Sequence, residues 1–298
     1  MARALIVIDG GRFPVAAVCR TLGVARSNVA HRRARWAHRR DLRGRPPCED
    51  GTVLEQLRTL AMQRPTYGYR RLWALLRRQR RSLGLPPVNA KRVYRLAKAH
   101  KFLLQRYTGS PPVLVHEGTV AVEQSDQRYC SDGLDITCDN GERVRVTFSL
   151  DCCDRQAIAF AATTAGISGE LVRDVMVETL IKRFGEVPEL PHPAEWLSDN
   201  GSGYIARETR AFAADIGMVP RRTPYRSPQS NGMAEAFVKT FKRDYVRINP
   251  TPDAATVLAQ LRAWFADYNL VHPHSALQYR SPEEFREDQQ RPKSCPVS

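Results

Sequence analysis

Three acidic residues, Asp132, Asp199 and Glu235, lie far apart in the chain but in surroundings that could bring their carboxylates together. Asp199 closes the strand-like run 194–198, and Glu235 falls in the first turns of a helix that follows the turn residues 230–232. A carboxylate at a strand end and one on a helix can converge, although 35 residues lie between them. Converging carboxylates are hard oxygen ligands for Mg²⁺ or Mn²⁺. Two such ions, about 3.5–4 Å apart, can activate an attacking oxygen and stabilise a leaving one in phosphoryl transfer.

The residues around these acids resemble the three acidic motifs of D-D-E transposases. The matching segments are Tyr129–Asp132, Ser198–Gly201 and Ser227–Glu235, with a family-like tail at Tyr268–Leu277 followed by Ser281 and Pro282. The chain resembles the second-reading-frame (OrfB) product of bacterial insertion sequences of the IS-three family, and the segment Asp151–Arg155 makes the IS-two subgroup the nearest match. The likeness runs from about Pro14 to Phe285 and therefore covers nearly the whole chain.

This resemblance implies an enzyme, a DNA transposase, whose catalytic residues and metal ligands are Asp132, Asp199 and Glu235, with Mg²⁺ (or Mn²⁺) as cofactor. Such an enzyme cuts the ends of its element with water and transfers the released 3′-hydroxyl to another phosphodiester. The family's first product is a circle with joined ends. The implied partners are double-stranded DNA (terminal inverted repeats and target), further copies of this chain, and the OrfA product of an upstream reading frame, as partner or fusion.

The first acid has an alternative, because Asp135 lies on the same predicted strand as Asp132. Side chains an odd number of residues apart on a strand point to opposite faces, so only one of the two can reach the metals. Asp132 has an aromatic residue, Tyr129, three positions upstream, as the family does, although Trp is more usual there. Asp132 is therefore the assigned first acid, and Asp135 stays the alternative.

The helix that carries Glu235 also carries Lys239 and Lys242, four and seven residues further along the same face. Lys242 matches the basic residue that the family places seven positions after its catalytic glutamate. A cation there can hold a phosphate of the transposon end beside the metals. The alternative is a simple surface pair, worth only about 0.2–0.5 kcal/mol. The basic loop 221–232 before the helix favours DNA contact by both lysines.

Charge is distributed unevenly along the 298 residues, which are enough for two or three domains. Residues 1–110 hold 25 Lys and Arg against 5 Asp and Glu, whereas residues 111–298 hold 21 against 26. Of the 25 basic residues, 22 are Arg, whose planar forks suit phosphate better than mere solubility requires. The asymmetry predicts a nucleic-acid-binding front half joined to a domain with another task.

The basic front half divides into two helical segments separated by Pro- and Gly-rich linkers at 44–47 and 109–112. The first domain, 1–45, contains a helix-turn-helix pattern whose second helix would present Arg32 and Arg33 to DNA. Its small core would come from five apolar residues, Ala16, Ala17, Leu22, Val24 and Val29. The second domain, 48–108, resembles the helical DNA-binding segment that precedes the family's catalytic core. The basic residues expected on the terminal repeats are Arg70, Arg71, Lys91, Arg92 and Arg95.

Beyond the second linker the pattern changes from helical to alternating, which marks the catalytic domain, 113–290. Three short strands are predicted at 132–137, 143–150 and 156–162, with a hairpin at 139–141. A helix capped by Ser168, a strand ending at Asp199, a helix at 206–216 and a strand at 218–220 follow. This order predicts an α/β layered fold. The family resemblance makes it the RNase H-like core of the retroviral-integrase superfamily, preceded by an all-α helix-turn-helix DNA-binding region.

Other features exclude competing classes. Seven cysteines, an odd number without a Cys-x-x-Cys pair, favour reduced thiols over disulfides or zinc. The apolar run 5–8 is too short for a signal peptide, and no stretch approaches a membrane span, so we expect a cytoplasmic protein that works on the nucleoid. His272 and His274 are expected to be structural, because two-metal chemistry needs no histidine.

Two rival functions stay open at this point. The first is a DNA-binding regulator of transposition that has lost catalysis. The intact acidic triad and Lys242 speak against it. The second is a cellular RNase H-like nuclease, which the helix-turn-helix front end and the His272–His274 tail disfavour.

Overall fold

The computed structural model describes residues 5–8, 11–37, 49–105, 121–199, 201–222 and 232–291. The chain separates into two compact units, Met1–Thr52 and Val53–Ser298. The predicted linkers at 44–47 and 109–112, and residues 223–231 of the predicted basic loop, lie outside the described residues. The 1–45, 48–108 and 113–290 domain boundaries therefore stay predictions. No helix among the described residues is long and apolar enough to cross a membrane.

The N-terminal unit begins with a hairpin that the sequence did not predict, in which β1 (Leu5–Ile8) pairs antiparallel with β2 (Gly11–Pro14). The two predicted helices follow as α1 (Val15–Thr21) and α2 (Arg26–Ala37), joined by a turn with Gly23 at φ +62°.

The small core predicted for these two helices is largely wrong. Leu22 is 68% exposed and Val24 is 42% exposed, while Cys19 is buried. Two short helices offer too few apolar faces to enclose a core, so most of their side chains stay in contact with water. Arg32 and Arg33 are exposed on α2, as expected of residues that meet DNA.

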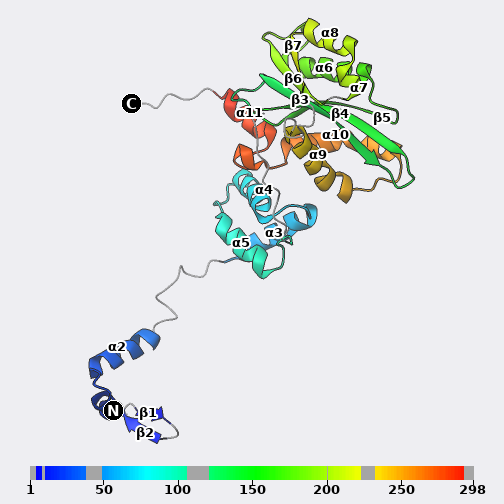
Figure 1. Cartoon of the computed structure of the whole chain (residues 1–298). Coiled ribbons are helices and arrows are strands. Elements are labelled where there is room, and N and C mark those ends of the chain that lie inside the picture. The colour runs from blue at the N-terminus through cyan, green and yellow to red at the C-terminus, as the bar shows by residue number, and fades with distance from the viewer. Residues whose placement is uncertain are drawn as a thin grey trace, which may run out of the picture. The chain divides into compact units, whose positions relative to one another are not determined.

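The helical segment of the second unit consists of α3 (Gly51–Gln63), α4 (Tyr69–Ser82) and α5 (Ala90–Ala99) (Figure 1). Asn89 caps α5, because its side chain accepts a hydrogen bond from the N–H of Lys91 at 2.8 Å. The three helices close on a shared core, which consists of Val53, Leu57, Tyr67, Leu72, Leu75, Leu76, Val88, Val93, Leu96 and Ala97.

The catalytic part is built on a five-stranded sheet in the order β5-β4-β3-β6-β7. The strands are β3 (Arg128–Thr137), β4 (Arg143–Asp151), β5 (Ala157–Thr163), β6 (Ala194–Ser198) and β7 (Met218–Arg222). The first three form an antiparallel meander, and β6 and β7 add in parallel on the other side of β3. Hence β3 lies at the centre of the sheet, where the meander meets the parallel strands.

Helices cover both faces of this sheet (Figure 1). The helices α6 (Gly169–Phe184), α7 (Ser202–Ile205) and α8 (Arg207–Asp215) share one core with Tyr129 and Trp196. On the other face lie α9 (Gly232–Asp244) and α10 (Ala254–Leu270), followed by η3 (Ser275–Leu277) and α11 (Pro282–Gln290). This is the RNase H-like arrangement. Every strand and helix predicted for this part is present.

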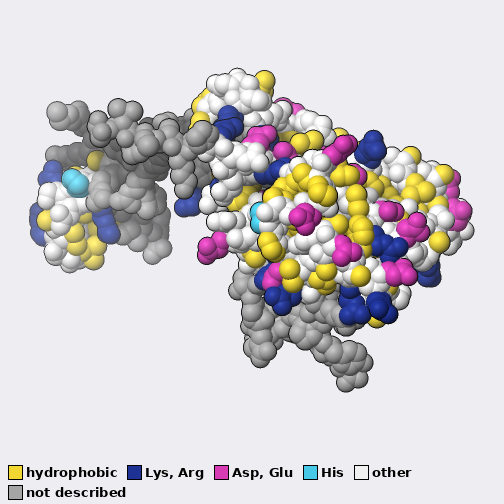
Figure 2. All heavy atoms as spheres, turned by 90° about the horizontal axis from the view of Figure 1, so that it is seen from above, with side chains coloured by type: hydrophobic (Ala, Val, Ile, Leu, Met, Phe, Trp, Pro, Cys, Tyr) yellow, Lys and Arg dark blue, Asp and Glu magenta, His cyan; other side chains and the backbone are white. Residues whose placement is uncertain are grey.

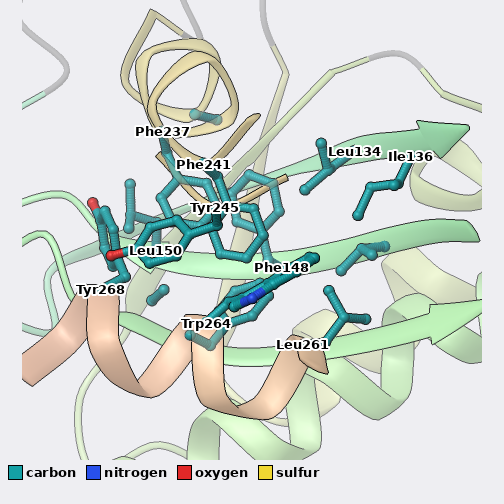
Figure 3. Close-up of a cluster of buried hydrophobic side chains, with 14 of the residues drawn as sticks. Leu134, Ile136, Phe148, Leu150, Phe237, Phe241, Tyr245, Leu261, Trp264 and Tyr268 are labelled. Carbon is teal, nitrogen blue, oxygen red and sulfur yellow. The ribbon is translucent and has the colours of Figure 1, made fainter. Parts of the chain in front are cut away.

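Aromatic side chains fasten α9 to the sheet (Figure 3). The rings of Phe237 and Phe148 are 4.5 Å apart, and Phe241 packs on Phe265 of α10 at 4.7 Å. Each of these rings is almost fully buried, which stabilises the fold by about 1.5–3 kcal/mol per side chain. Because α9 is packed in this way, its other residues are held at fixed positions over β3.

A buried charge cluster, defined here as Arg183 with Asp126, Asp151 and Asp154, ties α6 to the turn after β4. The guanidinium of Arg183 lies 2.9 Å from Asp154, 3.1 Å from Asp126 and 3.6 Å from Asp151. Burial, reinforced by the charge of Asp154, raises the pKa of Asp151 to about 7. Asp151 ends β4 and Asp154 lies in the turn after it, and the sequence did not reveal their buried partner.

Candidate active site and nucleic-acid interface

The sheet brings Asp132 and Asp199 together through the register of its two central strands. Ser131 on β3 pairs with Ser198 on the parallel strand β6, and each aspartate follows its serine by one residue. Because neighbouring strands lie about 4.8 Å apart, the two carboxylates leave the sheet side by side. Both line one cavity of about 340 Å³ beside the carboxyl end of β6.

Glu235 reaches the same region from α9, which packs against β3. Its neighbours Ala234 and Phe237 are buried in the core under the helix, while the Glu235 side chain itself is 37% exposed. The aromatic contacts that hold α9 on the sheet therefore fix the position of Glu235 relative to β3. The residue lies in the first turn of the helix, where a negative charge is favourable.

The environment of Asp132 raises the pKa of its carboxyl. Burial raises this pKa from 3.8 to about 6, against the effect of a hydrogen bond that the Gly133 N–H donates at 2.7 Å. The negative charges of Asp199 and Glu235 add to the rise. Like charges act in this way over short distances, as expected if the three acids converge on one region.

The donor set suits a hard divalent cation. All three side chains are carboxylates, and a divalent cation would relieve the repulsion that raises the pKa of Asp132. In the conformation described, no three Asp, Glu, His or Cys side chains of the described residues are close enough to hold one ion between them. The acids thus surround a common region without forming a closed ligand cage.

Tyr204 is a part of this site that the sequence did not indicate. Its hydroxyl lies 2.7 Å from the Thr147 hydroxyl and accepts a hydrogen bond from the Ser131 hydroxyl at 3.3 Å. Burial raises its pKa, so the phenol stays protonated. A methyl group on Gly203 would come within 3.1 Å of the Ile167 carbonyl, so a larger residue would crowd the backbone here. These contacts fix the segment that follows Asp199 beneath the cavity.

The structure separates the two candidates for the first acid, as the strand pattern predicted. Asp132 is half-buried on the α9 side with Leu134, whereas Asp135 is 57% exposed on its side chain. The nearest cation to Asp135 is Arg145, at 3.9 Å. Asp135 also lines the cavity, but its exposed carboxylate has the surroundings of a surface residue.

The two lysines on α9 have different surroundings. The ammonium of Lys239 lies 3.3 Å from a Glu235 carboxylate oxygen, and its side chain is 77% exposed. Lys242, in the last turn of α9, is half-buried and forms no ion pair with any described residue. Lys239 therefore forms the surface ion pair with Glu235 that is the alternative to DNA contact. The charge of Lys242 is available to a phosphate.

The residues of the helical segment that were predicted to contact DNA differ in their exposure. Lys91, Arg95 and Arg70 are exposed, and Arg92 is half-buried on α5. Two further arginines on α4, Arg77 and Arg81, are exposed too, although the sequence gave no reason to single them out.

Arg71 behaves differently from its neighbour Arg70. Its guanidinium donates a hydrogen bond to the buried carboxylate of Asp244 at 3.1 Å, so its charge is neutralised inside the protein. A side chain engaged in this way is poorly placed to contact DNA at the same time.

The histidine pair of the tail is structural, as predicted. His272 is 1% exposed and its Nδ1 lies 2.8 Å from the Tyr67 hydroxyl. Burial lowers the pKa of His272 well below 6.5 and that of His274 to about 3, so both rings are neutral near pH 7. Tyr67 itself lies in the core and is 2% exposed.

Comparison with known proteins agrees with this geometry. Residues 122–228 and residues 217–282 each match a family model described as an integrase core domain, and residues 49–108 match one described as an HTH-like domain. The transposase InsD of the Escherichia coli insertion element IS2A/D/F/H/I/K is 50% identical over 289 residues, which cover 95% of this chain and 93% of that relative. This chain belongs to the insertion-element transposases with an integrase core.

A second relative gives the same result for this transposase. InsD of the insertion element IS2D from Escherichia coli strain K12 is also 50% identical over 95% of the chain and 93% of its own length. Among solved structures, a simian T-cell lymphotropic virus intasome in complex with PP2A regulatory subunit B56 gamma aligns with a TM-score of 0.48 at 12% identity, over 71% of this chain and 70% of the other.

Proposed function

We propose that this transposase cuts the ends of an insertion element and joins them to new DNA with Asp132, Asp199 and Glu235 as catalytic residues. The observation that carries the proposal is the meeting of three like charges at one edge of the sheet, where the charges of Asp199 and Glu235 help to raise the pKa of Asp132. Carboxylates that repel one another are kept together at a functional site when a bound cation balances their charge.

The three carboxylates would hold Mg²⁺ or Mn²⁺, and a pair of these ions would supply activation of the attacking oxygen and stabilisation of the leaving oxygen. The contribution of the protein is placement. Asp132 and Asp199 come from adjacent strands, Glu235 comes from the anchored helix α9, and Tyr204 supports the segment after Asp199. Attack by water releases a 3′-hydroxyl at the element end, and attack by that hydroxyl then transfers the strand.

DNA would be held by cations outside the acidic triad. Lys242 follows Glu235 by seven residues on the same helix, and its free ammonium is suited to a phosphate near the scissile bond. On the helical segment, Arg70, Lys91, Arg92 and Arg95 would contact the terminal inverted repeats. Arg32, Arg33 and Lys239 would add contacts from their exposed positions.

The finer partners are part of the same proposal. We infer that several copies of the chain assemble on the two ends and the target DNA, and that the OrfA product of an upstream frame joins them as a partner or fusion. The DNA substrate places this work on the nucleoid.

The experiment is an end-processing assay with the full chain and a duplex oligonucleotide that carries the element end. Mg²⁺, Mn²⁺ or a chelator is added, in the presence and absence of the OrfA product, and nicks and joined strands are resolved on a gel. We expect metal-dependent nicks that leave a 3′-hydroxyl, followed by joining. Binding to the end without cleavage under any of these conditions would indicate the catalytically inactive regulator instead. Cleavage without a requirement for the end sequence would indicate a general nuclease.

A further inference from the structure

The arginines of α4 point in two directions that separate two tasks. Arg70, Arg77 and Arg81 are exposed. Arg71 and Arg78, seven residues apart on a neighbouring face of the helix, instead bind the catalytic part. Two turns of helix separate them, so they form one docking face.

The helical segment meets three elements of the catalytic part through charged pairs, two from the docking face of α4 and one from Arg64. Arg78 lies 2.5 Å from Glu284 of α11 and donates to the Val271 carbonyl at 3.0 Å. Arg64, just beyond α3, forms a two-pronged pair with Asp267 of α10, at 2.5 and 2.8 Å. Paired forks of this kind fix orientation as well as distance.

The third contact, with Asp244, is the most deeply buried. Asp244 is the last residue of α9 and is 1% exposed. One of its oxygens accepts a hydrogen bond from Arg71 at 3.1 Å, and the adjacent Arg243 donates to both oxygens at 2.6 Å. The ring of His272 lies 3.7 Å away and is neutral, so it adds no compensating charge. Asp244 is thus neutralised partly by its own helix and partly by the helical DNA-binding segment.

Asp244 lies on the same helix as Glu235 and Lys242, so its contact with Arg71 can affect their positions. Glu235 stands nine residues earlier on the same helix and Lys242 two residues earlier. A straight helix transmits a shift at one end to the other, over about 14 Å in this case. Whatever moves Arg71 relative to Asp244 therefore moves the DNA-binding helices relative to Glu235.

We propose that Asp244 and Arg71 are a positioning pair, which sets the distance between the DNA end held by the helical segment and the catalytic residues on α9. The pair touches neither the metals nor the scissile phosphate. It determines which phosphodiester of the bound end lies over the carboxylates. This inference rests on the proposed function, because it concerns where that reaction takes place.

The test replaces Asp244→Asn in the full chain and reads the position of each nick on the end-containing duplex at single-nucleotide resolution. We expect affinity for the end to stay within about twofold, because α5 is untouched. Cutting at the correct phosphodiester should fall about 10- to 100-fold, as expected for a misplacement of the order of 1 Å. New nicks at neighbouring positions should appear. Arg71→Lys, which keeps the charge but shortens the reach, should give an intermediate pattern.

A purely structural role predicts another result. If Asp244→Asn lowers the melting temperature and reduces all products in proportion, with the nick still at the wild-type position, the positioning role is wrong. The matched control is Asp288→Asn, because Asp288 is an exposed carboxylate on α11 that pairs with Arg280 and Arg291, neither of which belongs to α4. This control should keep both the position and the rate.

A second measurement needs no catalysis. Amide hydrogen exchange in the full chain should show α4 losing protection in Asp244→Asn and in Arg71→Lys, while the central strands β3 and β4 keep theirs. Unchanged protection of α4 would overturn the docking pair. A wild-type chain that cuts no DNA would count against the proposed function alone, since the exchange result would still decide the role of the pair.

Discussion

The catalytic domain contains two clusters of carboxylates that differ in how their charge is balanced. In the buried cluster, Asp126, Asp151 and Asp154 share the guanidinium of Arg183, and backbone N–H groups donate to Asp151 at 2.7 to 3.0 Å. At the catalytic edge, Asp132 and Asp199 each accept one backbone hydrogen bond and face a cavity.

This difference distinguishes acids that stabilise the fold from acids that are placed to bind a ligand. The buried cluster has its cation built in and its oxygens occupied, so removing that cation should damage the fold. Of the three proposed catalytic acids, Asp132 and Asp199 face the cavity, and Glu235 pairs only with the exposed Lys239 among the described residues. The charges of Asp199 and Glu235 still act on Asp132. Removing one of their charges should therefore damage the chemistry and leave the fold intact or more stable.

The largest effect is expected at the catalytic edge. Asp132→Asn, Asp199→Asn and Glu235→Gln should each reduce end cleavage and strand transfer by at least about 100-fold, because an amide is a poor ligand for a hard cation. Thermal unfolding without metal should show each variant to be at least as stable as the wild type. A clear loss of stability would mean that these acids, like the buried cluster, are structural.

The matched control for this set is Asp135→Asn on the opposite side of the same strand. Its carboxylate is exposed and lies 3.9 Å from Arg145, so activity should stay within about twofold. An inactive Asp135 variant beside an active Asp132 variant would reverse the assignment of the first acid.

The second largest effect is expected at the buried cluster. Arg183→Met leaves three carboxylates without their cation, and the free energy of unfolding should fall by about 3–5 kcal/mol. Urea unfolding should be measured at pH 8, where the raised pKa of Asp151, about 7, still leaves that carboxyl mostly ionised. Arg173→Met on the same helix provides the comparison, since Arg173 pairs with the exposed Glu208 at 3.8 Å. It should cost less than about 1 kcal/mol.

The sequence predicted the elements that carry the three proposed catalytic acids, because those elements depend on local signals. A strand that ends at Asp199 and a helix that begins before Glu235 can be recognised from alternation, turn residues and caps. The Ser168 cap is confirmed, since its hydroxyl accepts a hydrogen bond from the Leu171 N–H at 3.1 Å. Convergence then follows from the order of strands in the sheet, with β3 beside β6.

The buried charges could not be predicted, because their partners come from distant parts of the chain. Arg183 meets Asp154 from 29 residues away, and Arg71 meets Asp244 from 173 residues away. In the Arg-rich helix α4, adjacent Arg70 and Arg71 look alike in the sequence. Only the packed structure shows that one is exposed and the other is docked.

A smaller effect is expected from the cation beside the catalytic acids. If Lys242 contacts a substrate phosphate, Lys242→Ala should slow cleavage and transfer by about 10- to 100-fold, the value of one hydrogen bond to a charged group. Metal affinity should not change, and Lys242→Arg should recover part of the rate because it keeps the charge. Lys239→Ala, which removes the exposed partner of Glu235, is the control and should have little effect. Transfer by Lys242→Ala at the wild-type rate would remove Lys242 from the substrate site.

The smallest effect concerns pH and tests whether the catalytic acids bind a cation as a group. With a pKa of about 6, Asp132 is ionised at pH 7 and largely protonated at pH 5. A metal ion must displace that proton, so its apparent affinity should be about tenfold weaker at pH 5 than at pH 7. Without metal the sign is opposite. The folded state holds this proton more tightly than the unfolded chain, whose pKa is near 3.8, so this group stabilises the fold at low pH and loses that contribution as pH rises toward 6. Measuring melting temperature against Mg²⁺ concentration at both pH values separates the two effects. In Asp132→Asn the pH dependence of the metal-induced shift should disappear, and its persistence would mean that another group governs metal binding.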